Sequence, residues 1–518
     1  MATRTRGRVY ADVTVGDFSG GLNVRDALTE LAPNESPDLW NVTTDERGGI
    51  RKRLGYSKWN ASAAANLITY HYESSVVSLI LHYSKADGKL YSDPGTGVLT
   101  LRKTFTANGR LSIVDFAGVV YAIHSADGLW KSTDGTSWSA LVATSGSLPT
   151  GDQLAVWQNK LWVASSTSNL LSFSAPGDAT KWASGDDAGS NYIREGNDFP
   201  IVCLYGAAGA DYQTNPSLIV GKRSGAQGSV HRVIDAATAD YVTIDQAVGP
   251  GGPGSITSLY GVLYIISPTG AYSTDGQSAL VPAGQKIAPL FDPNHLDYSQ
   301  ASGFVAGRQN GRVFFSVARV GSTGNDLCLE YDPLSHAFTA RSDAMAWYSS
   351  YGATGDVLLG SSSSVTGQVY KLNDTVGSDD GAAITSWFLT KVFEPAGRYE
   401  ARLQHIRAVG TGDDLTLSAI KDFDTSGVQK VVSLGTTDGF EWDSDGWDDP
   451  DVGWGNQTLE GYADFRPRIR GRAFQFRVDE SSTATALQSP LLESTNPLTV
   501  GAWAVYGLTL SFTPLVPA

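Results

Sequence analysis

The side chains that most often transfer protons or bind metal ions are present but not grouped. The chain has seven histidines and 53 acidic residues. The histidines stand singly, without the spacing of a zinc site or a neighbouring nucleophile motif. They are His71, His82, His124, His231, His295, His336 and His405. No Gly-x-Ser-x-Gly motif of a hydrolase occurs. We therefore expect no catalytic residues, no metal and no cofactor, and we predict that the chain is not an enzyme.

Glycoside hydrolysis and phosphate binding are two further kinds of chemistry that a chain with these residues could perform. A glycosidase needs two carboxylates about 5–10 Å apart, and with 53 acidic residues the sequence leaves that possibility open. The segment Gly221-Lys222-Arg223-Ser224 is superficially similar to a phosphate-binding loop, but it lacks the upstream glycine that such a loop requires. Cys203 and Cys328 are the only cysteines, so we expect two buried thiols and no disulfide framework.

The most acidic stretch runs from residue 438 to residue 451 and contains no basic residue. Its acids are Asp438, Glu441, Asp443, Asp445, Asp448, Asp449 and Asp451, interleaved with tryptophans. Clustered carboxylates suit calcium, but Gly446 is misplaced for an EF-hand loop. We interpret the stretch as a solvated loop with aromatic anchors. The alternatives are a calcium site, a sugar-binding loop, or a channel or partner surface formed by Asp443, Asp445, Asp448, Asp449 and Asp451.

One turn points to a particular fold. The segment 132–138 reads Ser-Thr-Asp-Gly-Thr-Ser-Trp, and residues 273–276 repeat part of it. It resembles the Asp-box of sialidase-like propellers, although it is one residue shorter. In those propellers the box is a folding device, in which Asp and Ser side chains bind turn amides while Trp packs between strands. The turn therefore favours a propeller and says little about chemistry.

The length, composition and net charge of the chain limit the class of protein to which it can belong. A chain of 518 residues suggests two or three domains. A hydrophobic content of 41% is typical of a globular protein. No window is long and apolar enough for a membrane helix, and no signal peptide is recognisable at residues 1–16. The net charge of −15 argues against a protein that grips nucleic acid, but an acidic wall would let DNA slide past without sticking.

A repeated pattern occupies the middle of the chain. A short apolar strand, a turn, a second apolar strand and a polar turn recur about every 40–50 residues, the period of a four-stranded propeller blade. The repeats pair 76–81 with 89–91, 119–123 with 128–130, 160–164 with 170–173, 262–266 with 270–272, 312–317 with 327–331 and 356–360 with 368–370. A weaker unit lies at 217–220 and is either a blade or an insertion. We predict an all-β protein with a β-propeller at 61–375, with six blades favoured and seven as the alternative.

The flanking segments read differently. After residue 376 the strands lengthen and alternate polar with apolar residues, for example at 402–409, 473–478 and 505–512. This pattern is typical of an antiparallel sheet with one solvated face, so we predict a β-sandwich at 376–518. Residues 1–60 read as an extended arm with a hairpin, and Arg4, Arg6 and Arg8 stand on alternate positions of its start.

The arm carries a further motif. Its residues are Phe18, Gly20, Gly21, Leu22 and Asn23, then Trp40 and Asn41, then Gly48, Gly49, Arg51, Arg53, Gly55 and Tyr56. Together, in this order, they resemble the N-terminal signature of the tail nozzle proteins of short-tailed bacteriophages, also called tail hub, tail tubular protein B or packaged-DNA stabilisation protein. The resemblance covers about 40 residues. A looser likeness lies in the Trp-x-Leu-Thr-Lys and Gly-Leu-Thr-Leu-Ser-Phe strands of the C-terminal part.

The resemblance implies a structural virion protein. Such a nozzle would form a homo-oligomer, about a hexamer, below the tail adaptor and portal, with tail fibres or a tail needle as further candidate partners. It would be assembled in the host cytoplasm, retain packaged double-stranded DNA and conduct it during ejection. The N-terminal segment and the sandwich would build the platform, and the propeller would decorate or extend the tube. Two alternatives stay open: a propeller lectin or glycoside hydrolase acting on the host surface, and a cellular scaffold propeller.

Overall fold

The computed structural model describes residues 11–45, 48–194, 198–206, 217–351, 357–362, 367–372, 377–396, 400–411, 415–432, 461–480 and 504–514. The chain divides into two compact units. The first unit comprises residues 1–55, 334–340 and 374–518, and the second comprises residues 56–333 and 341–373.

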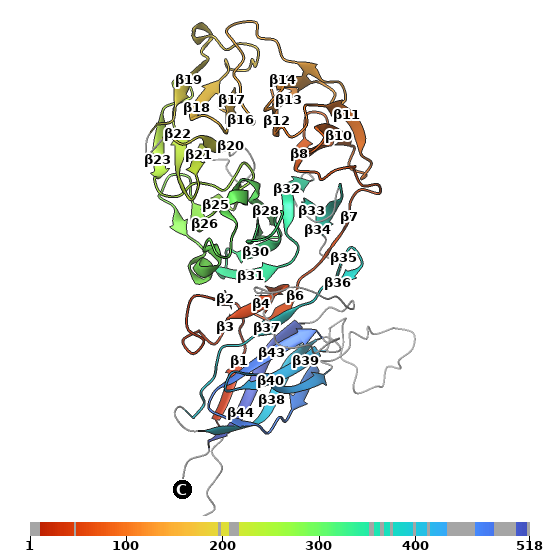
Figure 1. Cartoon of the computed structure of the whole chain (residues 1–518), viewed down its shortest axis with the longest axis vertical. Coiled ribbons are helices and arrows are strands. Elements are labelled where there is room, and N and C mark those ends of the chain that lie inside the picture. Colours follow the sequence, from red (N-terminus) through yellow and green to blue (C-terminus); the bar gives the residue numbers. More distant parts are fainter. Residues whose placement is uncertain are drawn as a thin grey trace, which may run out of the picture. The chain divides into compact units, whose positions relative to one another are not determined.

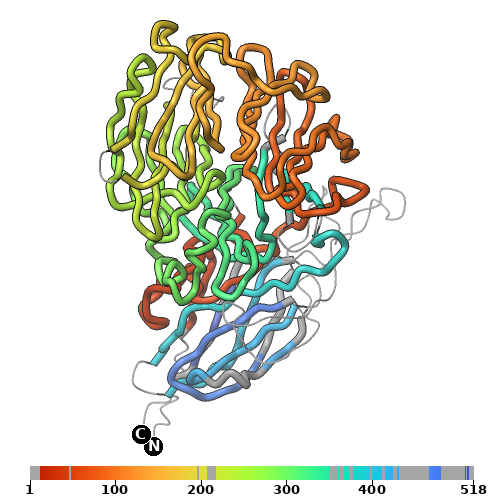
Figure 2. Tube along the Cα trace, turned by 45° about the horizontal axis from the view of Figure 1, so that its top comes forward, coloured from red at the N-terminus to blue at the C-terminus, as the bar shows by residue number. Residues whose placement is uncertain are grey.

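The second unit is a β-propeller, as predicted from the repeats. Its first sheet contains β8 (Tyr70–Ser74), β9 (Leu79–Ser84), β10 (Lys89–Asp93) and β11 (Thr100–Thr104). The next contains β12 (Leu111–Phe116), β13 (Val119–His124), β14 (Gly128–Ser132) and β15 (Ser139–Ala140), and the third contains β16 (Gln153–Trp157), β17 (Lys160–Ala164), β18 (Leu170–Phe173) and β19 (Gly189–Tyr192). Figures 1 and 2 show these sheets following one another around a centre.

The remaining sheets continue the circle. The fourth sheet contains β20 (Ile201–Gly206), β21 (Leu218–Ser224), β22 (Gln227–Val233) and β23 (Tyr241–Asp245). The fifth contains β24 (Ile256–Leu259), β25 (Val262–Ser267), β26 (Gly270–Thr274) and β27 (Val281–Pro282). The sixth blade contains β28 (Val305–Gln309), β29 (Arg312–Val317) and β30 (Leu327–Asp332). Short 3₁₀ helices lie at Ser184–Asp186, Gln285–Phe291 and Tyr298–Gly303. The weak unit at 217–220 is thus β21, the second strand of a four-stranded sheet.

These six blades are built from strands that are consecutive in the sequence. One more sheet lies between β28 and β8 in the circle, because its innermost strand contacts both. It contains β32 (Met345–Tyr351), β33 (Val357–Ser362) and β34 (Val369–Leu372), and β7 (Tyr56–Lys58) from the start of the unit pairs with β34. A strand from one end of the propeller therefore completes a sheet from the other end, which joins the two ends of the ring.

Polar side chains reinforce this closure. The amide of Asn60 donates to Gly367 O at 3.0 Å, and its Oδ1 accepts from Val369 N at 2.8 Å. The indole of Trp59 donates to Asp93 at 2.6 Å, which ties the same segment to β10. Buried polar groups need such partners, because an unpaired one costs about 1–3 kcal/mol. The closure is therefore specified by side chains as well as by strand pairing.

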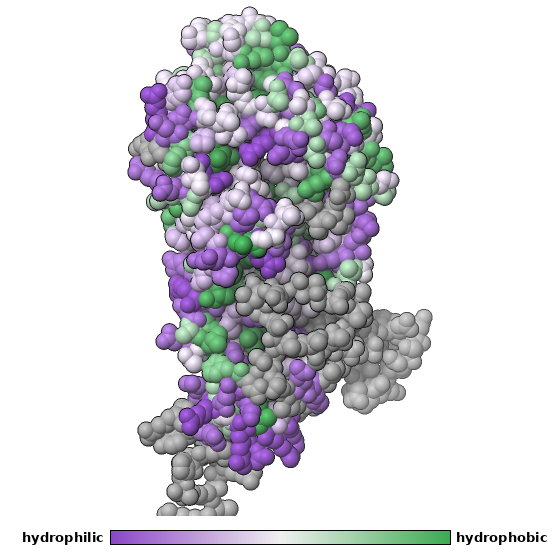
Figure 3. Space-filling view, viewed as in Figure 1, coloured by the Kyte–Doolittle hydropathy of each residue, from purple (hydrophilic) through white to green (hydrophobic). Residues whose placement is uncertain are grey.

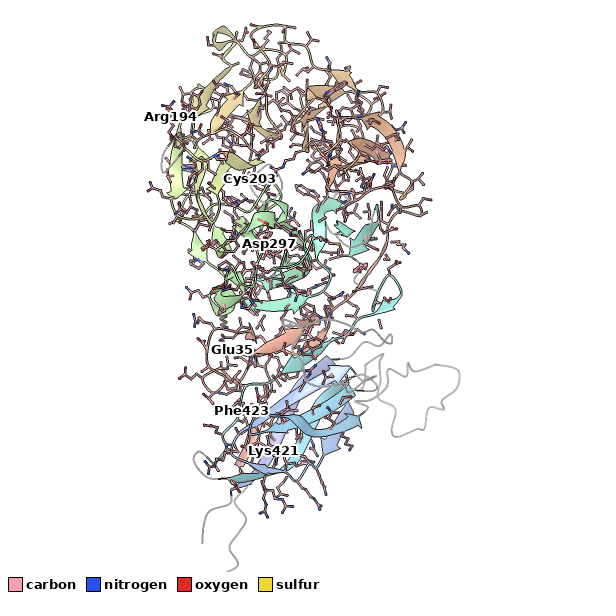
Figure 4. All side chains as sticks on the ribbon, viewed as in Figure 1. Glu35, Arg194, Cys203, Asp297, Lys421 and Phe423 are labelled. Carbon is pink, nitrogen blue, oxygen red and sulfur yellow. The ribbon has the colours of Figure 1, made fainter. Side chains whose placement is uncertain are left out.

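The apolar residues of the repeats pack between neighbouring sheets. Ile123 on β13 and Leu161 on β17 belong to one buried cluster, and Trp162 and Val220 belong to the next. Cys203 and Cys328 are both buried and free, as predicted, and burial raises the pKa of each thiol to about 12. Cys203 lies within the ring wall, whereas Arg194 lies at its periphery (Figure 4). On the visible face of the surface, hydrophobic and hydrophilic residues are intermixed (Figure 3).

The first unit contains two larger sheets. One has the order β41 (Gly461–Phe465), β38 (Ala401–Thr411), β44 (Ala504–Pro514), β6 (Ile50–Lys52) and β5 (Val42–Thr44), with β1 (Ala11–Val15) paired with β44 and β42 (Arg470–Gly471) paired with β38. The other includes β31 (Ala337–Arg341), β4 (Asp38–Trp40), β37 (Trp387–Leu389), β43 (Phe474–Glu480), β39 (Leu415–Lys421) and β40 (Asp424–Val432). Short pairs are formed by β2 (Gly21–Leu22) with β3 (Glu35–Ser36) and by β35 (Ser378–Asp379) with β36 (Ala382–Ala383).

These sheets combine both ends of the chain. The strands predicted at 402–409, 473–478 and 505–512 are present as β38, β43 and β44. Their apolar faces meet where Phe474 and Phe512 lie with ring centroids 5.2 Å apart. The predicted sandwich stays a prediction. The chain was predicted to divide at residues 60 and 375 into three segments, whereas residues 11–45 and 48–55 here share one unit with the C-terminal strands.

None of the helices in the part of the chain that the structure describes has the length and apolar character needed to cross a membrane.

Candidate functional site

The innermost strands of the propeller enclose a cavity of about 690 Å³. Its wall is formed largely by β8, β12, β16, β20, β28 and β32. These strands are placed there because each begins a sheet whose later strands lie further from the centre. A cavity of this size with mixed aromatic and polar walls is typical of a small-molecule site.

Aromatic side chains line much of this cavity. Tyr70 and Trp347 lie with ring centroids 4.8 Å apart. The hydroxyl of Tyr70 donates to Ile113 O at 3.2 Å and accepts from Ile113 N at 3.1 Å. The hydroxyl of Tyr72 accepts from Asp115 N at 2.8 Å. Burial raises the pKa of Tyr70 to about 12, so this group stays neutral and holds adjacent sheets together.

Two carboxylates, Asp115 and Asp152, line the cavity. The hydrogen bond from Leu154 N to Ser112 Oγ, 3.1 Å long, aligns β16 with β12. By this register Asp152 and Asp115 stand five residues apart along the strand direction, which is about 16 Å. Asp115 also accepts from Ser74 Oγ at 2.7 Å and Ser75 N at 2.7 Å. These two acids therefore do not form the closely spaced pair that glycoside hydrolysis needs.

A chain of groups near the ring closure has the residue types of a nucleophile relay. Ser361 Oγ is hydrogen-bonded to His71 Nε2, and His71 Nδ1 lies 2.7 Å from His82 Nδ1. His82 Nε2 lies 3.6 Å from Asp93, which is too long for a hydrogen bond but close enough for charge attraction. With Ser361 and His71 as donors, His82 Nδ1 accepts, and the single N–H of His82, on Nε2, faces Asp93. Ser361 and both histidines are buried, so no substrate reaches them.

Burial lowers the pKa of His71 well below the ordinary histidine value, and the neighbouring His82 lowers it further. Burial also lowers the pKa of His82, although Asp93 acts against this shift. Both rings are therefore neutral at pH 7. The arrangement joins β8 and β9 of the first sheet to β33 of the closing sheet. We interpret it as a structural link. No group of three or more metal-ligating side chains is found among the residues that the structure describes.

The Asp-box-like turns act as the sequence predicted. Asp134 accepts from Thr136 N and Ser137 N, both at 2.8 Å, and Ser132 Oγ accepts from Gly135 N at 2.9 Å. These hydrogen bonds lower the pKa of Asp134. Trp138 packs against the cluster shared by the first two sheets. In the partial repeat, Asp275 accepts from Gln277 N and Ser278 N.

The N-terminal motif lies mostly in the first unit, where glycine is needed at two close approaches. Gly21 has φ +66°, and a Cβ there would lie 2.7 Å from Phe338 O. At Gly55 a Cβ would lie 2.0 Å from Ser378 O. Because the nearest atoms are backbone, neither position has room for a side chain. The motif glycines therefore let the arm lie against other segments of the unit.

Arg53 is the centre of the motif. Its side chain is fully buried, and its guanidinium donates to both carboxylate oxygens of Asp379, at 2.8 and 2.5 Å. Arg53 Nε donates to Asn41 Oδ1 at 2.7 Å, and Asn41 Nδ2 donates to Thr385 O at 2.8 Å. This network joins residues that are more than 300 positions apart in the sequence. We call Asn41, Arg53, Asp379 and Thr385 the clasp.

The other motif residues support the same unit or the ring. Phe18 lies edge-on to Phe388 with ring centroids 5.0 Å apart, and Trp40 stacks on Trp387 at 6.1 Å. Leu22 is completely buried. Four more form hydrogen bonds within the unit: Gly20 N–H donates to Asn34 O, the Asn23 amide donates to Glu35, Gly48 O accepts from Phe18 N, and Gly49 N–H donates to Asp45. Arg51 pairs with Ala504 across two strands. The ring of Tyr56 contacts the ring of Tyr370.

The clasp supplies a test of the motif. Changing Arg53 to methionine would leave the Asp379 carboxylate largely buried without its cation, so we expect the unfolding free energy of the first unit to fall by about 3 kcal/mol. Urea denaturation with hydrogen exchange of residues 377–389 would measure the change. The matched control is Arg25→Met, because Arg25 and Asp26 form an exposed pair and no measurable change is expected. Equal effects of the two substitutions would contradict the clasp.

A family model agrees with the propeller fold of the second unit. Residues 61–241 match a family model described as the DUF6242 beta propeller domain. No curated protein matches the chain. Among solved structures, the computationally designed Ika8 protein is 11% identical, covers 61% of this chain and 99% of its own, and has a TM-score of 0.36. YCF48 bound to D1 peptide is 10% identical, with 62% and 97% coverage and a TM-score of 0.39.

Some residues that the sequence singled out lie outside the described part of the chain, and other residues of the cavity and the clasp were not predicted. Asp438, Glu441, Asp443, Asp445, Asp448, Asp449 and Asp451 lie outside the described residues, as do Arg4, Arg6 and Arg8. The proposed channel or partner surface and the calcium alternative stay predictions. The cavity residues and the clasp partner Asp379 were not singled out in the sequence. The only available signal was position, since most cavity residues come shortly before the strand pairs of the repeats.

Proposed function

We propose that the chain is the tail nozzle of a short-tailed bacteriophage, a structural protein that retains packaged DNA and conducts it during ejection. The observation that carries the proposal is the clasp. Two residues of the motif, Asn41 and Arg53, hold the N-terminal segment onto residues that follow the propeller in sequence, which supports a shared structural role for the motif. A platform made from both ends of the chain, with a propeller inserted between them, suits a tube whose decoration is carried on a fixed base.

Charge adds support. The net charge of −15 would keep a channel from binding DNA phosphates tightly. A hexamer would multiply this repulsion around the bore. The expected partners are further copies of this chain, the tail adaptor and, below the tube, fibres or a needle.

Two measurements test the proposal. Quantitative mass spectrometry of purified particles should give about six copies per virion, and electron microscopy of the protein with its adaptor should show a ring around an open bore. A protein absent from particles, or one that stays monomeric and ignores the adaptor, would refute the nozzle function.

A second function, glycan binding by the propeller, is favoured by the aromatic cavity. Aromatic faces and polar groups in a concave site are what a saccharide ring requires. The separation of Asp115 from Asp152 favours binding over hydrolysis at this site. A glycan array would detect binding, and a reducing-sugar assay on host envelope would detect hydrolysis. A negative result in both assays would exclude this function.

A further inference from the structure

One end of the propeller cavity carries an excess of positive charge. Lys85 directly follows β9 and Arg110 directly precedes β12, and both line the cavity. Both residues therefore lie at the end where the innermost strands begin. Lys85 is exposed to solvent, and Arg110 is partly exposed. Arg223, at the end of β21, lies close enough that the charge on Arg110 adds to the effect of burial in lowering its pKa.

The carboxylate nearest to Arg110, that of Asp152, offsets only part of this positive charge. Arg110 Nη1 lies 3.8 Å from Asp152 Oδ2, beyond hydrogen-bonding distance. Asp152 is instead hydrogen-bonded by the backbone N–H of Ser166 at 2.8 Å and by the Ser166 hydroxyl. Among the described residues Lys85 has no ion pair, and partial desolvation of its ammonium group together with the charge on Arg110 lowers its pKa. An anion placed between Lys85 and Arg110 would relieve their repulsion.

An unsatisfied acceptor marks the same end of the cavity. Gln153 is the first residue of β16, lines the cavity and is only 3% exposed. Its Nε2 donates to Ile201 O at 2.8 Å, but its Oε1 has no hydrogen-bond partner among the described residues. Since a buried acceptor without a partner is destabilising, the site is suited to a ligand that brings a hydroxyl or amide donor.

The aromatic wall supplies the third element of recognition. The hydroxyls of Tyr70, Tyr72 and Tyr205 are each engaged with a neighbouring strand, which fixes the rings in place. Trp347, partly exposed, stands beside Tyr70. Rigid aromatic rings contact flat or ring-shaped ligands with little loss of conformational entropy.

We propose that this end of the cavity binds an acidic saccharide, with its carboxylate between Lys85 and Arg110, a hydroxyl donating to Gln153 Oε1 and its ring against the aromatic wall. The cavity of about 690 Å³ has room for one or two sugar units. This assignment goes beyond the nozzle function and does not depend on it. It also goes beyond general glycan binding, because it specifies the charge of the ligand and the residues that contact it.

Isothermal titration calorimetry on the full chain would test the site with digalacturonic acid, a neutral disaccharide (cellobiose) and inorganic phosphate. We expect digalacturonic acid to bind at least tenfold more tightly than cellobiose, and its affinity to fall with added salt. Phosphate alone should bind more weakly than digalacturonic acid, because it lacks the ring. Binding of phosphate and digalacturonic acid with equal affinity would indicate a simple anion site and overturn the saccharide assignment.

Variants connect the binding to the named residues. Lys85→Gln and Arg110→Gln should each weaken digalacturonic acid at least tenfold while leaving the thermal unfolding temperature nearly unchanged. The matched control is Lys181→Gln, a half-exposed lysine that does not line the cavity and should leave affinity unchanged. No binding by the parent protein, equal affinity for cellobiose, or an equal loss in the Lys181 variant would each overturn the proposal.

Discussion

Replacing Arg341 with methionine is expected to lower the free energy of unfolding of the propeller by about 3–5 kcal/mol. The Arg341 guanidinium donates to Asp343 through Nε at 2.9 Å and Nη2 at 2.5 Å, and through Nη1 to Glu330. All three side chains are almost inaccessible to solvent. Methionine would fill much of the space but leave Asp343 as a buried charge without its cation. Urea denaturation followed by circular dichroism would measure the loss.

The matched control is Arg319→Met. Arg319 also pairs with a carboxylate, Asp326 at 3.0 Å, but both side chains are about 30% exposed. Water can replace the lost cation there, so we expect a change within about 1 kcal/mol. A further variant, Arg341→Lys, keeps the charge and should recover part of the stability. If Arg341→Met and Arg319→Met have similar effects, burial of the charge network does not decide its contribution.

The propeller is also expected to lose stability as the pH falls from 8 to 5. Four buried histidines, His71, His82, His124 and His231, have pKa values lowered chiefly by burial, and that of His231 falls to about 3. In the unfolded chain they titrate near 6.5. Below that pH the histidines bind protons in the unfolded state but not in the folded state. The free energy of unfolding is therefore unaffected by these groups above about pH 6.5 and decreases below it. His231 alone should contribute about 2 kcal/mol of loss at pH 5.

Urea denaturation at several pH values would measure this dependence, and His231→Gln isolates one histidine. His231 Nε2 lies 2.8 Å from Ser229 Oγ and Nδ1 lies 3.0 Å from Thr243 Oγ1. Glutamine retains a donor and an acceptor for these hydroxyls but does not titrate. The difference in stability between pH 8 and pH 5 should therefore shrink by about 2 kcal/mol in the variant. An unchanged difference would show that His231 takes up its proton in the folded state as well.

Local patterns in the sequence were sufficient for much of the propeller. Residues 161–164 are apolar, and β17 packs with both faces between neighbouring sheets, so a short hydrophobic run followed by a turn identifies such a strand. The turn at Ser132–Asp134 is equally local, since its hydrogen bonds join residues two or three positions apart. At 217–220 the pattern was weaker, and the sequence left open whether this unit was a blade.

The sites could not be predicted in the same way. Lys85 and Arg110 look like ordinary loop residues, and only the closing of the ring brings them to one cavity. The same holds for Ser361 and His71, which lie 290 positions apart and yet form a hydrogen bond. A carboxylate pair, too, could be judged only after the register of β12 and β16 fixed the distance between Asp115 and Asp152.

The sequence by itself determined that the chain is all-β, that its middle forms a propeller and that its two thiols are buried. These conclusions depend on short-range periodicity and on backbone preferences, which each segment carries with it. Only the tertiary structure decided which distant segments meet. Arg53 finds Asp379, and β7 completes the sheet of β34, because strand pairing and buried charge select partners in space. Nothing in the spacing of residues along the chain records those partners.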